Sequence, residues 1–128
     1  MLKKEIEKAL NEQINVEMWS AYLYLSMAAY CHSIRQTGMA RWFEVQFKEE
    51  QDHAKILFNY IVRRNGRVLL EAVEPVPLGW ISVLEVFVNT LGHERSVSVK
   101  INTLVTLTKN NNYYATMSIT QWLIDVQV

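Results

Sequence analysis

The 128-residue sequence is poor in the residues that cross-link or interrupt a chain, with one cysteine, two prolines and four glycines. The single cysteine, Cys31, excludes an internal disulfide and suits a reducing compartment. No apolar run reaches the roughly 18 residues that a membrane-spanning helix needs, and charges interrupt the N-terminus too often for a secretory signal. We therefore expect a soluble, cytoplasmic protein with no membrane partner.

The sequence also lacks an excess of charge of either sign. Its 13 Lys and Arg residues balance 13 Asp and Glu residues, so no net field attracts nucleic acid or an anionic surface. We expect no nucleic-acid partner. Hydrophobic residues make up 50% of the chain, which at this length favours one core and a single domain over residues 1–128.

Apolar residues recur with the 3.6-residue period of a helix in four segments of the sequence. The first segment runs from about Lys3 to Cys31. The second follows Thr37 as its N-cap and ends at Gly66, which suits the left-handed C′ position of a helix end. These two segments are joined by a short turn, so we expect an antiparallel hairpin.

The third segment begins at Ser82, where Glu85 completes a Ser-x-x-Glu capping box. Its inward stripe is predicted to be Leu84, Phe87, Leu91, Glu94, Ser98, Ile101 and Val105. Residues 96–108 have only moderate helix propensity, so a strand is the alternative there. A fourth helix is predicted to open near Tyr113.

The connection between Gly66 and Ser82 is long enough to fix the topology. Its about 15 residues can span roughly 50 Å when extended, whereas a helix of about 27 residues is about 40 Å long. We predict an all-α four-helix bundle in which this connection crosses over and makes the second and third helices parallel. A surface loop of the same length is the alternative.

The residues with the clearest chemistry are Glu50 and His53, one turn apart on the second helix. Their ligand atoms face the same way and can hold one metal ion. Glu17 and Glu94 each replace an apolar residue in the stripes of the first and third helices. Counted from the two turns, Glu17 lies at the level of Glu50, and Glu94 at the level of Gln127. This arrangement predicts a buried metal site.

A carboxylate in an apolar stripe is costly unless it is protonated, paired or bound to a metal. For one glutamate, an ion pair with a long Lys or Arg side chain would suffice. Three carboxylates at one level repel one another, however, and no Lys or Arg occupies the matching positions. Oxygen-rich ligands with one imidazole suit iron or manganese better than a structural zinc.

Other polar and aromatic residues carry weaker predictions. Tyr24 lies two turns after Glu17 and is either a hydrogen bonder or electron donor beside the metal, or a core tyrosine. Glu49 is either a solvated surface acid or an accessory ligand. Helix-end or surface positions are expected for His32, His93 and Cys31, and packing roles for Trp19, Trp42, Trp80 and Trp122. The stretch 18–31 is apolar nearly all round, which predicts contacts between subunits of a homo-oligomer.

Four stretches together resemble the non-haem bacterial and archaeal ferritins throughout residues 1–128. They are LNEQINVEMWSAYLYLSMAAY, EEQDHAKILFNYIVRRNGRV, LGHERSVSVKINTL and ITQWLIDVQV. The ordered set Glu, Glu-x-x-His, Glu and Gln is more specific than any single motif. The resemblance implies a ferritin-like four-helix bundle with a di-iron centre.

The resemblance also assigns roles to individual residues. It implies that Glu17, Glu50 and His53 bind the first iron. Glu50 would bridge to a second iron held by Glu94, and Gln127 would lie beside the pair. In the same way, a central tyrosine corresponds to Tyr24 and an auxiliary third-iron ligand to Glu49.

The activity that the resemblance implies is ferroxidation, in which dioxygen or peroxide oxidises Fe(II) to Fe(III). The product would be stored as mineral inside a shell of 24 subunits, the assembly of the family. Asp52 stands where the haem-binding relatives have an axial methionine, so no haem is expected. A di-metal oxidase or peroxide scavenger that stores no mineral and a non-catalytic ferritin-like scaffold are the alternative functions.

The sequence departs from the family pattern near its end. It stops at Val128, so we expect a truncated chain whose fourth helix is cut short and which has no fifth helix. The family's second-iron glutamate beyond Gln127 is absent, and Val126 replaces the usual acid at an auxiliary-iron position. The shortened helix is expected to uncover three apolar side chains at one end of the core: Leu10, Ile61 and Leu84.

Overall fold

The structure is a computed structural model that describes residues 2–110, 121 and 125. Its helices, in chain order, are α1 (Lys4–Ser33), α2 (Thr37–Arg63) and α3 (Val83–Asn110). The first three predicted helices are confirmed, and the possible strand over 96–108 is helical. Apart from Gln121 and Asp125, the expected fourth helix lies outside the described residues, and so do Trp122, Val126 and Gln127.

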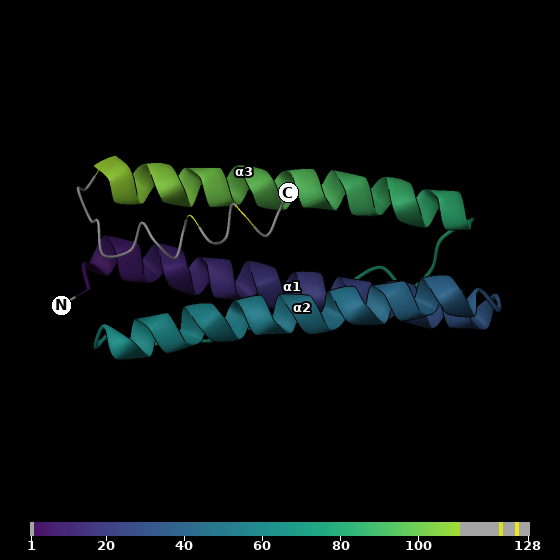
Figure 1. The fold of residues 1–128 in the computed structure, drawn as a ribbon, viewed down its shortest axis with the longest axis horizontal. Coiled ribbons are helices and arrows are strands. Elements are labelled where there is room, and N and C mark those ends of the chain that lie inside the picture. Colours follow the sequence, from purple (N-terminus) through teal and green to yellow (C-terminus); the bar gives the residue numbers. More distant parts are fainter. Residues whose placement is uncertain (1, 111–120, 122–124, 126–128) are drawn as a thin grey trace.

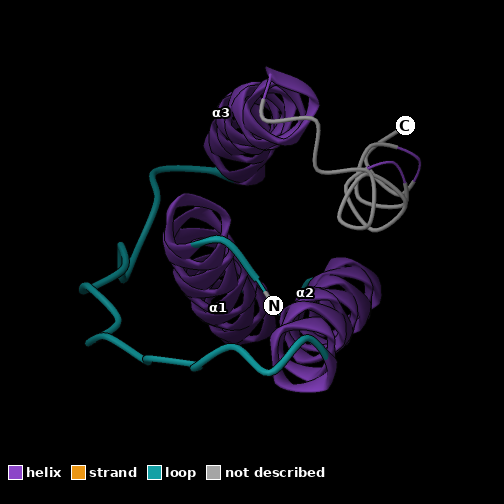
Figure 2. Cartoon of the chain, turned by 90° about the vertical axis from the view of Figure 1, so that its left-hand side faces the viewer, coloured by secondary structure: helices purple, strands orange, loops and turns teal. Residues whose placement is uncertain are grey.

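The connection between α2 and α3 runs the length of the bundle. α1 and α2 form an antiparallel hairpin, and α3 begins again at the end of the bundle where α2 begins, so α2 and α3 are parallel (Figure 1). The connection, drawn in teal in Figure 2, passes alongside α1. The Asn11 side chain on α1 holds it, accepting from Leu69 N–H (2.9 Å) and donating to the Arg67 carbonyl (3.0 Å). The predicted crossover is confirmed.

Both ends of α2 differ in detail from the prediction. Gln36, not Thr37, is the N-cap, and its side chain makes no capping hydrogen bond. At the other end, the Gly66 N–H donates to the Ile61 carbonyl (2.9 Å), which is the 6→1 bond of a Schellman motif. The left-handed residue of that motif is Asn65, with φ 60°, because the helix ends one residue earlier than the prediction placed it.

Gly66 is nevertheless required at its position, because neighbouring side chains leave no room for a Cβ atom. A Cβ added there would lie 2.9 Å from Ile61 Cγ2, 3.1 Å from Glu7 Oε2 and 3.1 Å from Leu2 Cδ2.

At the start of α3, the predicted capping residues are confirmed. The Glu85 N–H donates to Ser82 Oγ (3.3 Å), although the Glu85 carboxylate accepts from Ile81 N–H (2.7 Å) rather than from Ser82.

The buried apolar side chains form two clusters, one on each side of the middle of the bundle. The terminal cluster contains Leu2, Ile6, Leu10, Ile14, Ala54, Leu57, Tyr60, Ile61, Val97, Ile101 and Leu104. The turn cluster contains Leu23, Tyr24, Met27, Ala28, Cys31, Ala40, Phe43, Val76 and Val86. Full burial of each large side chain stabilises the fold by about 1.5–3 kcal/mol.

The inward face of α3 is rotated relative to its predicted stripe. Its buried residues are Val86, Thr90, Val97, Ile101, Leu104 and Thr108, because these face α1. Leu84, Phe87 and Leu91 are 73%, 43% and 54% exposed, which contradicts their place in the predicted inward stripe, although a shortened fourth helix predicts an uncovered Leu84. The expected exposure of Leu10 and Ile61 is wrong, since both are 0% exposed and belong to the terminal cluster, at the opposite end of the bundle from Leu84.

We expect Gly66→Ala to lower the free energy of unfolding by about 1–3 kcal/mol, because the added methyl group overpacks its contacts. Gly92→Ala is the matched control. Gly92 lies within α3 with nothing within 4 Å of an added Cβ, so the better helix former should raise stability by about 0.5–1 kcal/mol. Urea titrations measure both values, and equal stability of Gly66→Ala and the unmodified chain would contradict the close approach.

Candidate metal centre

Three titratable side chains meet between the terminal and turn clusters. Glu17 comes from α1, and Glu50 and His53 come from successive turns of α2. Each offers a ligand atom within 4.8 Å of the others. His53 Nδ1 lies 3.6 Å from Glu17 Oε2 and 3.5 Å from Glu50 Oε2. All three residues are buried, with Glu17 at 0% exposure, so the predicted convergence of these residues is present.

Two buried carboxylate oxygens of this group have no hydrogen-bond donor among the described residues. Glu17 Oε2 and Glu50 Oε2 are buried and accept no hydrogen bond from any residue within the described ranges. A buried carboxylate oxygen without a donor is costly. Because both oxygens converge on the His53 imidazole, a divalent cation bound among them would satisfy both. The donor set therefore fits iron.

Gln13 is a residue of the centre that the sequence interpretation missed. Its Nε2 donates a hydrogen bond of 3.0 Å to Glu17 Oε1, and Gln13 is only 3% exposed. The bond occupies one carboxylate oxygen and leaves Oε2 facing His53, so Gln13 orients Glu17 as outer partners orient metal ligands. The available sequence signal was a polar residue one turn before Glu17 on the same helix face.

The pKa values of the three groups shift together. Burial, reinforced by the neighbouring Glu17 carboxylate, raises the pKa of Glu50 to about 8. Burial would lower the pKa of His53, but the two carboxylates raise it to about 10. Burial also opposes ionisation of Glu17, yet its interactions with His53, Glu50 and Gln13 leave its pKa lowered. At neutral pH the metal-free centre thus holds an ionised Glu17 and protons on Glu50 and His53, which a bound cation would displace.

Glu94 and Tyr24 lie beside this group. Glu94, half-buried on α3, accepts a hydrogen bond from the Tyr24 hydroxyl through its Oε1. Tyr24 is fully buried, and burial together with Glu94 raises the pKa of its phenol, so the hydroxyl stays protonated and donates. The structure therefore brings both predicted residues to the middle of the bundle, with Glu94 outside the group of three.

The remaining predicted site residues have different positions. Glu49 is exposed on α2 and belongs to no potential metal-binding group within the described part of the chain, so its accessory role stays a prediction. Gln127 lies outside the described residues. His32 is exposed in the last turn of α1, where its Nε2 lies 2.9 Å from Glu44 Oε1, as expected for a residue at a helix end.

His93 and Cys31 are not surface residues. His93 Nε2 lies 2.7 Å from Ser20 Oγ, and its ring centroid lies 5.2 Å from that of Trp19. Burial, with the nearby charge of Lys100, lowers the pKa of His93, so the imidazole is neutral at pH 7. Cys31 lies near the end of α1, as predicted for a helix-end residue, but it is 0% exposed, and burial raises the pKa of its thiol. The prediction for His93 is wrong because the inward face of α3 is rotated relative to the predicted stripe.

A family model described as a ferritin-like domain matches residues 7–128. The chain belongs to the ferritin family. The bacterial non-haem ferritin of Staphylococcus epidermidis is 38% identical over 128 residues, which cover 100% of this chain and 77% of that protein. The Campylobacter jejuni protein is 39% identical over 127 residues, covering 99% of this chain and 76% of that protein. Within the family, the chain is thus a prokaryotic non-haem ferritin.

Solved ferritin structures agree with this assignment. The open pore ferritin from the hyperthermophilic archaeon Archaeoglobus fulgidus superposes with a TM-score of 0.97 at 41% sequence identity, covering 99% of this chain and 78% of that chain. The expected all-α ferritin-like fold is therefore confirmed. None of the helices in the described residues has the length and apolar character needed to cross a membrane.

The shifted pKa values predict how the stability of the metal-free protein depends on pH. The folded pKa of Glu50, about 8, exceeds its unfolded value of about 4.3, so the folded state retains a proton that the unfolded state has lost. The free energy of unfolding should then fall as the pH rises from about 5 to about 8. His53 adds a fall of the same sign between about pH 6.5 and its folded pKa of about 10.

Denaturant titrations of the metal-free protein at several pH values measure this slope. Glu50→Gln should flatten the slope below about pH 6.5, where His53 does not contribute, because the variant has no carboxyl group to titrate at that position. Glu12→Gln, on the exposed face of α1, should retain the slope of the unmodified chain. A free energy of unfolding that rises over this pH range would contradict the protonated state of the centre.

Proposed function

We propose that the chain is an iron-storage subunit with ferroxidase activity. Fe(II) is the substrate, dioxygen is the electron acceptor, and the Fe(III) product is stored as mineral inside a multi-subunit shell. The observation that carries this proposal is the burial of Glu17 and Glu50 with an oxygen each that lacks a donor and faces His53. The proposal includes a single domain over residues 1–128 and a cytoplasmic location.

The residues would divide the work as follows. Glu17, Glu50 and His53 would hold the first iron, and Glu50 with Glu94 would hold the second. Anionic carboxylates are hard ligands that stabilise Fe(III) relative to Fe(II), which favours oxidation. Binding would release the protons held by Glu50 and His53, while Tyr24 would hold the Glu94 carboxylate through its hydroxyl. The auxiliary role of Glu49 and the position of Gln127 beside the irons remain parts of the proposal.

Substitution of Glu50 tests the activity directly. Glu50→Ala should lower the initial rate of aerobic Fe(II) oxidation more than 100-fold, since loss even of an outer partner of a metal ligand costs about 10–100-fold. Glu12→Ala, a surface glutamate on α1, is the control and should leave the rate unchanged. Anaerobic Fe(II) titration followed by oxygen measures binding and rate on the same sample. Equal rates in the two variants would exclude a ferroxidase centre at Glu50 and favour the scaffold function.

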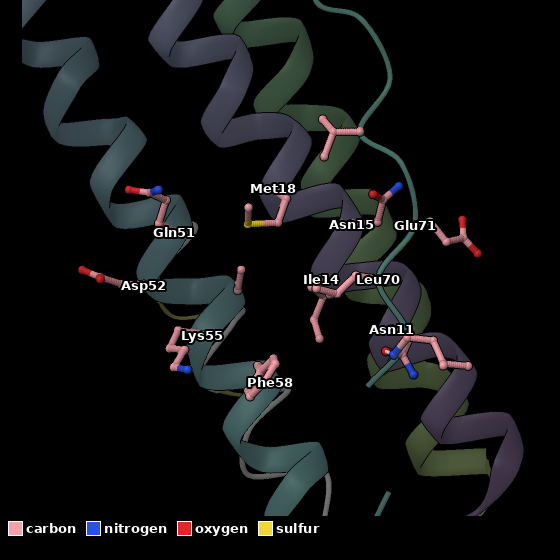
Figure 3. Close-up of a pocket in the computed structure, with 13 residues that line it drawn as sticks. Asn11, Ile14, Asn15, Met18, Gln51, Asp52, Lys55, Phe58, Leu70 and Glu71 are labelled. Atoms are coloured by element: carbon pink, nitrogen blue, oxygen red, sulfur yellow. Dashed lines mark hydrogen bonds between the residues drawn. The ribbon is translucent and has the colours of Figure 1, made fainter. Parts of the chain in front are cut away.

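An apolar groove that none of the three metal-site residues lines supports the proposed assembly. The groove has a volume of about 540 Å³ and lies between α1, α2 and the crossover connection (Figure 3). Ile14, Met18 and Phe58 give it an apolar floor, and Leu70, 70% exposed, overhangs it from the connection. Exposed apolar surface of this kind marks a protein–protein contact. The occupant that we propose is a second copy of the chain, as the ferritin resemblance implies.

A charged residue at the rim should disrupt this assembly without unfolding the subunit. Leu70→Glu places a carboxylate where the second copy would bury Leu70, so we expect smaller particles in analytical ultracentrifugation. Val99→Glu is the matched control, because Val99 is 64% exposed on α3 and does not line the groove. The proposed interface is wrong if Leu70→Glu sediments like the unmodified chain.

A further inference from the structure

Three polar contacts join α3 to α1 within the described residues. They join His93 to Ser20 (2.7 Å), Glu94 to Tyr24, and, nearer the turn, Thr90 Oγ1 to the sulfur of Met27 (3.4 Å). The two contacts that involve ionisable side chains come from neighbouring residues of α3. His93 has no metal-binding role in the proposed function, so its partly buried contact with Ser20 requires another explanation.

The Ser20 hydroxyl lies between the Val16 carbonyl and His93. Ser20 is 1% exposed, and its Oγ lies 2.8 Å from the Val16 carbonyl oxygen and 2.7 Å from His93 Nε2. A hydroxyl can donate one hydrogen bond and accept another, so Ser20 can pair with either neutral tautomer of His93. In both cases a hydrogen bond joins the imidazole on α3 to α1.

We propose that His93 is a positioning residue that fixes the rotation of α3 and thereby holds Glu94 at the metal centre. Neighbouring residues of an α-helix point about 100° apart around its axis. Because His93 and Glu94 both bond to α1, α1 lies within the angle between them. Without the Ser20 bond, the polar contacts from α3 to α1 within the described helices would be the one from the long and flexible Glu94 side chain and the Thr90–Met27 contact nearer the turn. The part of this inference that concerns binding of the second metal ion rests on the proposed function.

Three variants separate the hydrogen bond from the packing of the ring. His93→Phe keeps a ring beside Trp19 and Tyr24 but has no atom that can hydrogen-bond to Ser20. Ser20→Ala keeps the imidazole and removes the hydroxyl. His93→Gln provides a side-chain amide that can donate to or accept from Ser20 Oγ, so it should behave like the unmodified chain. Circular dichroism checks that each variant is folded.

The first readout needs no metal. The ultraviolet resonance Raman doublet of Tyr24, isolated as the difference from the Tyr24→Phe variant, reports whether its hydroxyl donates a strong hydrogen bond. We expect His93→Phe and Ser20→Ala to lose the donor signature and His93→Gln to keep it. If His93→Phe and Ser20→Ala both keep the signature, Glu94 does not depend on His93 and the inference is overturned.

The second readout is anaerobic titration with Co(II) as a redox-inert probe. In the unmodified chain and His93→Gln, we expect two ions per chain. In His93→Phe and Ser20→Ala, affinity for the second ion should fall about 10–100-fold, as for loss of other outer partners, with the first ion unaffected. If the unmodified chain binds one ion, the proposed two-iron function fails, and the Raman result still decides the role of His93. Unchanged second-ion affinity in His93→Phe would contradict the inference.

Discussion

A layer of buried polar groups divides the core of this protein, and the surrounding structure is arranged to accommodate it. Glu17, Glu50 and His53 lie between two apolar clusters, where an isolated charge would be strongly disfavoured. The metal-free chain limits that cost by retaining protons on Glu50 and His53 and by the hydrogen bond from Gln13 to Glu17. The fold tolerates these groups because the apolar clusters on both sides of the layer supply the stability that the polar layer removes.

Much of this arrangement could be predicted from the sequence, because helical spacing alone places Glu50 and His53 on one face and the length of the crossover sets the direction of α3. What the sequence did not predict depends on contacts between helices. The inward face of α3 could not be read from its large apolar residues, since Leu91 is exposed and Thr90 is buried. Gln13 was missed for the same reason, because a polar residue near a carboxylate indicates a hydrogen bond only once its burial is known.

The helices contribute unequally to the metal centre. α1 and α2 provide the complete group of three, whereas α3 contributes Glu94, which bonds to Tyr24 of α1 outside that group. α3 packs mainly on α1. The position of α3 relative to α1 therefore controls the second half of the proposed centre.

The crossover also has a consequence for the order in which the protein folds. α1 and α2 are joined by a short turn, so their contacts form at small loop-closure cost, whereas α3 can dock only after the long connection has closed. Since Glu17, Glu50 and His53 all belong to the α1–α2 hairpin, this group can assemble in the part of the chain that forms first. A metal ion bound there would stabilise the hairpin and give α3 a preformed surface on which to complete the bundle.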